Sequence, residues 1–199
     1  MRVNKGLMIA ATFDPTKRTS LITVADMCRK IEENSISLPL YQRDISWTLQ
    51  KCIDLLNYQL WGKAPVSPIS INVINTVDSA VPQVSFIDRE IISTIERGQY
   101  SVVDGQQRLT TNYKAYCNHD DFRNIVLDLG KGEFTEVRDS IRSNQIPVGI
   151  LLNKEDTKLF EYTKAKSALG SADVLSVLLQ VRSKMRNYNY TLNSAEDLT

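Results

Sequence analysis

The chain has 199 residues, of which 42% are hydrophobic and 24% charged, a composition typical of a soluble globular protein. Lys and Arg number 24 and Asp and Glu 23, so any phosphate binding must be local rather than the work of a globally basic surface. No run approaches the roughly 18 apolar residues of a membrane helix, and the N-terminus does not resemble a signal peptide. We therefore expect a cytoplasmic protein without membrane contact.

Several common kinds of site are excluded by residue usage. Cys28, Cys52 and Cys117 are too far apart for a CxxC zinc motif and odd in number, which argues against a disulfide framework. The single histidine, His119, rules out a His-rich metal centre. The sequence around Lys131 lacks the first glycine and the Ser/Thr of a phosphate-binding P-loop.

The chain first predicts a helix and a strand. Thr23 and Asp26 form a capping box at the start of the helix. One face of this helix is apolar and consists of Val24, Cys28 and Ile31. A short strand is expected over 36–40.

A second helix and strand follow. Ser46 or Thr48 can cap the helix, and Gly62 ends it. The inward face of the helix is formed by Leu49, Cys52, Ile53, Leu56 and Leu60. Pro65 and Pro68 mark a turn into a strand over 69–74.

Residues 77–99 form an excursion in which the isoleucines have helical spacing, at Ile87, Ile91, Ile92 and Ile95. A short strand over 100–103 then leads directly into a helix. Further strands are expected over 125–129 and, more weakly, over 146–150. Two helices follow over 153–169 and 171–188, and the second has an apolar stripe of Val174, Leu178, Val181 and Met185.

The pattern as a whole predicts an α/β (α+β) protein. We divide it into a mixed α/β domain over 1–152 and a helical extension over 153–199. Because an exposed apolar stripe favours association, the last helix is also a candidate surface for a homodimer or a partner subunit.

The first candidate site lies where the strand over 100–103 runs into a helix. Free N–H groups and the helix dipole favour an anion at a helix start, and Gly105 allows the anion to approach the backbone. Arg108 offers a planar fork of donors to phosphate. Gln106 and Gln107 could orient water or a base, and Asp104 could ligate Mg²⁺ or orient a nucleophile. The alternative is a plain turn in which Arg108 pairs with a carboxylate.

The second candidate site follows the strand over 36–40. Gln42 and Arg43 stand between that strand and Trp47. A sheet could bring both Gln-Arg pairs to one edge, where Arg43 and Arg108 would clamp phosphate. Taken singly, Trp47 could equally be a core anchor and Arg43 a solvated residue. Arg182, Lys184 and Arg186 could contact nucleic acid, although helix C-termini favour cations in any case.

Both segments resemble a known family. The matching residues are Pro39, Tyr41, Gln42, Arg43 and Trp47, then Gly62 and Pro65, and finally the run from Val103 to Thr111 that contains Asp-Gly-Gln-Gln-Arg. This order is similar to the DGQQR-motif family, which includes the N-terminal part of GmrSD-type modification-dependent restriction enzymes and related phage-defence proteins. The resemblance covers roughly residues 20–130.

The resemblance implies a ParB/sulfiredoxin-like fold and a nucleotide pocket. In it, Asp104, Gly105, Gln106, Gln107 and Arg108 would bind or hydrolyse a nucleoside triphosphate, with Asp104 as the catalytic residue. Tyr41, Gln42 and Arg43 would line the same pocket, and Mg²⁺ would accompany the nucleotide. The setting would be restriction, phage defence or its evasion.

Two alternatives stay open. One is a non-catalytic ParB-like regulator that binds DNA or a partner protein. The other is a metal-dependent ParB-like nuclease, which would need clustered carboxylates. Asp88 and Glu90 are the candidates to join Asp104 in such a cluster. The excursion over 77–99 is longer than is usual in the family. The fused HNH nuclease domain of relatives has no counterpart, so DNA cleavage by that route is not implied.

Overall fold

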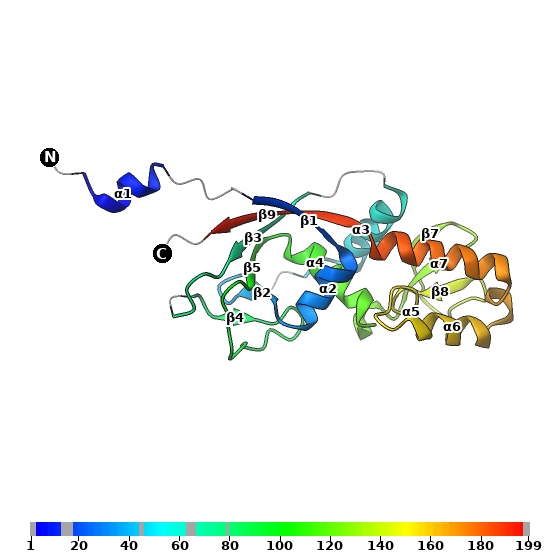
Figure 1. The fold of residues 1–199 in the computed structure, drawn as a ribbon. Coiled ribbons are helices and arrows are strands. Elements are labelled where there is room, and N and C mark those ends of the chain that lie inside the picture. The colour runs from blue at the N-terminus through cyan, green and yellow to red at the C-terminus, as the bar shows by residue number, and fades with distance from the viewer. Residues whose placement is uncertain (1–2, 13–17, 44–45, 63–66, 79, 197–199) are drawn as a thin grey trace.

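The protein is described by a computed structural model that covers residues 3–12, 18–43, 46–62, 67–78 and 80–196. These residues form a six-stranded mixed sheet and a three-stranded antiparallel sheet, each with helices packed on it (Figure 1). The expected α+β class is confirmed. None of the helices within the described residues is long and apolar enough to span a membrane.

The larger sheet contains β1 (Arg18–Thr23), β2 (Ile36–Pro39), β3 (Ile69–Val73), β4 (Gln83–Val84), β5 (Tyr100–Asp104) and β9 (Asn189–Glu196), in the order β1-β9-β3-β5-β2-β4. Strands β2 and β5 are parallel neighbours, whereas β3 is antiparallel to β5. The carboxyl ends of β2 and β5 and the amino end of β3 therefore lie at one edge of the sheet.

One face of this sheet is covered by α2 (Val24–Glu32) and α4 (Gln106–Tyr116). Alternate residues along each strand point to the same face, and here they are apolar and buried, as at Leu38, Ile71 and Val102. Met27 of α2 and Leu109 of α4 pack against them. This hydrophobic cluster fixes α4, and with it the Asp-Gly-Gln-Gln-Arg segment, against the sheet.

A second hydrophobic cluster surrounds the smaller sheet. It comprises β6 (Ile125–Asp128), β7 (Glu133–Glu136), β8 (Gln145–Pro147), α3 (Leu49–Trp61), α5 (Val148–Leu151), α6 (Asp156–Ala165) and α7 (Ala172–Arg186), with the short 3₁₀ turns η1 (Asp120–Phe122) and η2 (Ser167–Leu169). Helix α4 contributes to both clusters, through Leu109 and Tyr116 on one side and Ala115 on the other.

The predicted helix signals are confirmed at three positions. The Thr23 hydroxyl accepts a 3.1 Å hydrogen bond from the Asp26 N–H at the start of α2. Thr48, rather than Ser46, caps α3 by accepting from the Lys51 N–H. Gly62 ends α3 in the left-handed conformation, with φ +59°.

The helical spacing in the excursion over 77–99 was misleading, because its described residues form β4 and irregular loops and not a helix. Val84 pairs with Ile91 in an antiparallel bridge, and Arg89 takes a left-handed φ of +53° between them. Ile91 is 69% exposed, so the four isoleucines do not share a buried face. The backbone groups here form hydrogen bonds within this short hairpin instead of within a helix.

Strands β1 and β9 were missed by the sequence patterns. Beyond α7 the chain does not continue as a helical extension but returns to the larger sheet as β9, between β1 and β3. Its polar residues alternate with Tyr190 and Leu192, which are buried. The division into domains at residue 152 stays a prediction.

The apolar stripe on α7 is not the exposed surface that we expected. Leu178 and Met185 are 0% and 1% exposed, and Val174 and Val181 are partly buried against the same cluster. The stripe packs on the core because α7 lies across α3 and the smaller sheet. The main argument for association through this helix therefore no longer holds, and such association stays a prediction.

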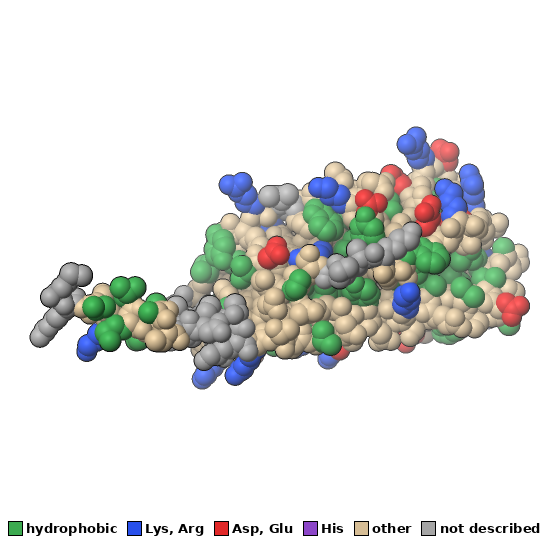
Figure 2. Space-filling model, turned by 90° about the horizontal axis from the view of Figure 1, so that it is seen from above, with side chains coloured by type: hydrophobic (Ala, Val, Ile, Leu, Met, Phe, Trp, Pro, Cys, Tyr) green, Lys and Arg blue, Asp and Glu red, His purple; other side chains and the backbone are tan. Residues whose placement is uncertain are grey.

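The N-terminal helix α1 (Lys5–Ala10) projects from the rest of the molecule, and Figure 2 shows hydrophobic side chains gathered on it. Leu7, Met8 and Ile9 are each about 60% exposed, at 62%, 59% and 61%. The Asn4 side chain caps this helix by accepting from the N–H groups of Gly6 and Leu7.

Candidate functional site

The two Gln-Arg segments lie together at one edge of the larger sheet. Gln42 and Arg43 follow the carboxyl end of β2, and Gly105 to Arg108 follow the carboxyl end of β5. Because β2 and β5 are adjacent and parallel, their following loops meet at the same edge. In open α/β sheets this is the usual place for a ligand.

Two hydrogen bonds tie the segments to each other. The Gln42 side-chain amide donates to the Val103 carbonyl oxygen over 3.1 Å. The backbone N–H of Trp47 donates to the Gln107 side-chain oxygen over 3.0 Å. Each glutamine thus uses its side chain to hold the backbone of the other segment in place.

Gly105 makes the sharp change from β5 to α4 and takes a left-handed φ of +98°. A Cβ atom there would lie 2.4 Å from Ile69 Cδ1 and 3.0 Å from Arg108 Nη2, so a side chain would have to displace Ile69 in addition to straining the backbone. Because glycine has no capping side chain, α4 starts without a side-chain cap among the described residues. The first N–H groups of α4 are therefore suited to an anion.

Arg108 is folded back over this turn. Its Nη2 donates to Asp104 Oδ2 over 3.2 Å and to the Pro68 carbonyl oxygen over 3.1 Å. The Arg108 side chain is 12% exposed, whereas that of Asp104 is 74% exposed. The pairing with a carboxylate, one of the two expectations for Arg108, is the arrangement found.

The remaining predicted residues differ in accessibility. Tyr41 and Arg43 are exposed, and Arg43 forms no hydrogen bond or ion pair with another described residue. Gln106, in contrast, is 9% exposed. Arg43 can therefore turn toward a ligand at this edge, whereas Gln106 belongs to the interior side of α4.

A buried polar cluster supports α4 from behind. The Asn112 side chain donates to the Arg108 carbonyl oxygen over 2.9 Å and to the Tyr190 hydroxyl over 3.1 Å, and a 2.6 Å hydrogen bond joins Gln59 to the same hydroxyl. Burial raises the pKa of Tyr190, so its hydroxyl stays neutral. The cluster links α4 to α3 and β9, and no sequence motif pointed to it.

Residues 24–197 match the family described as GmrSD restriction endonuclease, N-terminal domain. The chain belongs to this family. The matched range includes both Gln-Arg segments, and it confirms the resemblance noted in the sequence. No curated protein matches the chain.

One residue at the edge of this GmrSD-family domain escaped the sequence analysis. Arg89 Nη2 donates to the Gln42 carbonyl oxygen over 2.7 Å, so the excursion braces the segment after β2. Arg89 Nη1 and Gln42 Oε1 are both buried without a hydrogen-bond partner among the described residues. The sequence analysis missed this role because the spacing of the isoleucines around Arg89 indicated a helix.

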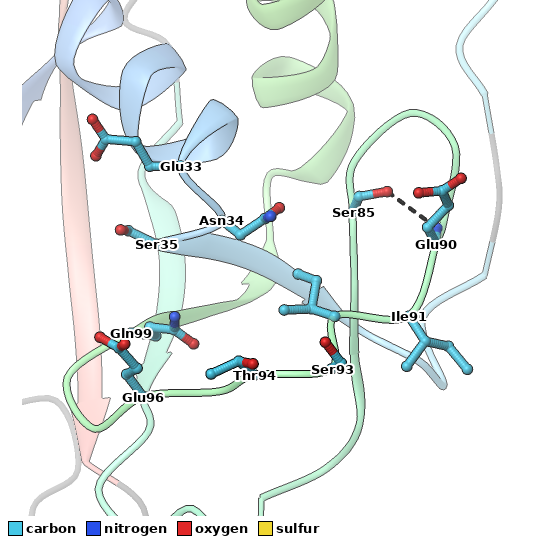
Figure 3. A pocket seen from close by; sticks show the side chains of 11 residues that line it. Glu33, Asn34, Ser35, Ser85, Glu90, Ile91, Ser93, Thr94, Glu96 and Gln99 are labelled. Atoms are coloured by element: carbon cyan, nitrogen blue, oxygen red, sulfur yellow. Dashed lines mark hydrogen bonds between the residues drawn. The ribbon is translucent and has the colours of Figure 1, made fainter.

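A cavity of about 400 Å³ lies elsewhere in the GmrSD-family domain, at the amino ends of β2 and β5 (Figure 3). Its lining includes the acidic side chains of Glu33, Glu90 and Glu96. Negative charge disfavours phosphate, and neither Arg43 nor Arg108 lines this cavity. It is therefore not part of the candidate site.

The arginines of α7 are structural. Arg182 is 6% exposed and donates to the carbonyl oxygens of Leu151 and Asn153 and to Asp156 Oδ1. Arg186 also binds Asn153 and Asp156. The suggestion that Arg182 contacts nucleic acid was wrong, because its guanidinium is occupied inside the protein.

Proposed function

We propose that this domain binds a nucleoside triphosphate at the edge formed by the carboxyl ends of β2 and β5, and that it acts in restriction or phage defence. The observation that carries the proposal is the joining of the two Gln-Arg segments at that edge by the Gln42–Val103 and Gln107–Trp47 hydrogen bonds. Family membership supports the biological setting.

The phosphates would be held by three kinds of donor. The N–H groups at the start of α4 would bind the terminal oxygens. Arg108 approaches Gly105 closely and would exchange its bond to Asp104 for a bond to phosphate, since a guanidinium matches either anion. Arg43 would close over the phosphates from the segment after β2.

Mg²⁺ fits this edge, with Asp104 as its protein ligand. Within the described residues no three His, Cys, Asp or Glu side chains converge on a metal position, but Mg²⁺ is usually bound by one or two carboxylates together with phosphates and water. When bound, it would neutralise phosphate charge. Release of Asp104 from Arg108 would leave the carboxylate free to hold the ion or to orient a water molecule for hydrolysis.

Thermal melting tests the proposal. Each of the four nucleoside triphosphates is added with Mg²⁺, and inorganic tripolyphosphate serves as a base-free ligand. Ligand at 100 times its Kd stabilises a protein by about 2.7 kcal/mol, which gives a clear rise in Tm. Arg43→Ala and Arg108→Ala should abolish the rise, whereas Arg29→Ala, which removes an exposed arginine of α2, should keep it. No rise with any ligand at millimolar concentration would reject the proposal.

Phosphate release then distinguishes hydrolysis from sensing. If the domain is an NTPase, Asp104→Asn should stop phosphate release while binding persists. If the wild-type protein binds but releases no phosphate, the non-catalytic regulator is the better description. DNA binding belongs to the same proposal, and gel-shift measurements with and without nucleotide test it.

A further inference from the structure

A cavity of about 220 Å³ adjoins the proposed phosphate edge along α4. Helix α4 contributes Gln107, Thr110 and Lys114, which lie on one face because they are three and four residues apart. The rest of the lining includes the apolar side chains of Trp47, Leu49 and Phe122. A volume below the roughly 300–1,000 Å³ of drug-sized ligand sites suits a single ring system and not a whole nucleotide.

One side chain that lines the cavity carries an unsatisfied hydroxyl group. Thr110 Oγ1 is buried and has no hydrogen-bond partner among the described residues. The neighbouring Thr111 hydroxyl, in contrast, donates to the Gln107 carbonyl oxygen of its own helix over 2.8 Å. A buried polar group without a partner is unfavourable. Because the Thr110 residue as a whole is only partly buried, rotation about its χ1 would bring the hydroxyl to a polar ligand atom in the cavity.

Gln107 connects the cavity to the phosphate edge. Its side-chain oxygen accepts from the Trp47 N–H, which fixes Trp47 beside the cavity and leaves the Gln107 amide hydrogens for another acceptor. Thr110 lies five residues beyond Gly105, about 7.5 Å further along the helix axis. A ligand with phosphates at Gly105 and a ring at Thr110 would therefore run along α4.

The charges of the cavity cancel and do not favour an anion. Lys114 Nζ lies 2.5 Å from Asp121 Oδ2, and this hydrogen bond lowers the pKa of the Asp121 carboxyl. The Cys52 thiol, also in the lining, stays neutral because burial raises its pKa. The cavity thus offers neutral donors and acceptors, a balanced ion pair and an apolar wall.

We infer that this cavity binds the base of the nucleotide whose phosphates lie at the Gly105 edge. A nucleobase matches the cavity because it is planar and carries hydrogen-bond donors and acceptors on its rim, which Thr110, Gln107 and the Lys114–Asp121 pair would meet. The apolar wall with Trp47 would cover its ring. This inference rests on the proposed function, to which it adds how the protein would distinguish one base from another.

The Trp47 indole can report on the cavity directly. The chain has two tryptophans, so ¹⁵N-labelled protein with Trp61→Phe gives one indole N–H signal. We expect at least one of adenosine, guanosine, cytidine and uridine to shift this signal saturably, and tripolyphosphate alone to leave it unchanged. The corresponding nucleoside triphosphate should compete with the nucleoside and bind more tightly than tripolyphosphate.

Three threonine variants test the role of the hydroxyl. Thr110→Val keeps the shape of the side chain and removes its donor, so it should weaken nucleoside binding about tenfold, the effect of one lost hydrogen bond, without lowering Tm. Thr110→Ser should retain binding. Thr163→Val is the matched control, because Thr163 is buried in α6 with its hydroxyl bonded to Leu159.

The outcomes separate this inference from the proposed function. Equal binding of tripolyphosphate and all four triphosphates, with no nucleoside effect on Trp47, would overturn the base site and leave the phosphate site intact. Nucleoside binding without tripolyphosphate binding would support the base site and reject the phosphate site. A shift of Trp47 by a single-stranded oligonucleotide but not by nucleosides would overturn the inference in favour of a nucleic-acid strand.

Discussion

The Gln42 side chain donates a 3.1 Å hydrogen bond to the carbonyl oxygen of Val103, a residue 61 positions later in the chain. This contact connects the loop after β2 to the carboxyl end of strand β5, immediately before Asp104. The position of Arg43 relative to Arg108 therefore depends on a neutral amide that takes no part in charge pairing.

Replacing Gln42 by Met should separate ligand binding from stability. The lost hydrogen bond is worth about 0.5–1.5 kcal/mol, and removal of the unpartnered Gln42 Oε1 offsets part of it. We expect a change in unfolding free energy of less than about 1 kcal/mol but about tenfold weaker tripolyphosphate binding, by urea denaturation and calorimetry. Gln50→Met, which removes only an exposed bond to Asp54, should leave the affinity unchanged. Equal affinities for the two variants would contradict a positioning role for Gln42.

A side chain at Gly105 should destabilise the protein. Gly105→Ala is expected to lower stability by about 1–3 kcal/mol through its positive φ alone, with a further loss from the contact at Ile69 Cδ1. Gly98→Ala is the matched control, because Gly98 also has a positive φ, +91°, but would place its Cβ in open space. Comparison of the two melting temperatures isolates the steric effect, and an equal loss in both variants would refute it.

Leu178 of α7 should be essential for folding. Leu178→Glu places a carboxylate in a fully buried position and should destabilise the protein by at least about 3 kcal/mol. Val177→Glu, one residue earlier and 50% exposed, should remain folded by circular dichroism. A folded Leu178→Glu protein of smaller size in light scattering would instead reinstate α7 as an interface.

The stability of the domain should fall in acid partly through Asp128. Hydrogen bonds from Gln145 and from the N–H groups of Lys131 and Gly130 lower the pKa of this carboxyl. Below the unfolded-state value of about 3.9 the unfolded chain takes up the proton first, so the contribution of Asp128 is present above that pH and lost as pH falls through the lowered folded value.

Urea denaturation between pH 3 and pH 7 checks this expectation. Asp128→Asn should be less stable than the wild type at pH 7 by about 1–3 kcal/mol, and the difference should shrink toward pH 3. A difference between Asp128→Asn and the wild type that stays constant with pH would show that the Asp128 carboxylate is not preferentially stabilised in the fold.

Local signals predicted the helices well, because a cap such as Thr48 or a terminator such as Gly62 acts within a few residues of its own position. Strands β1 and β9 were harder to predict. Among the β9 residues whose burial is described, Tyr190 and Leu192 alone are buried, so the alternation is short, and pairing with distant strands decides the structure. The polar cluster of Gln59 and Asn112 could likewise not be predicted, because these residues meet only through Tyr190, which lies far from both in the chain.

The candidate site was predictable in its position but not in its details. The order of strand, Gln-Arg pair and helix start fixed the sheet edge, because parallel strands end together. The sequence left open whether Arg108 binds phosphate or pairs with a carboxylate, and the structure shows the pairing with Asp104. The bracing of Gln42 by Arg89 depends on side-chain placement across separate loops, and no spacing rule in the sequence encodes it.

The position of β9 in the sheet has a consequence for folding during translation. The strand between β1 and β3 is synthesised after all the other described strands, so translation must pass Tyr190 and Leu192 before those two strands can be joined. Until then the growing chain carries open strand edges, which attract other strands. A premature stop codon after α7 would release a polypeptide that contains both Gln-Arg segments and yet cannot complete its sheet. Chaperones and proteases would act on such a product.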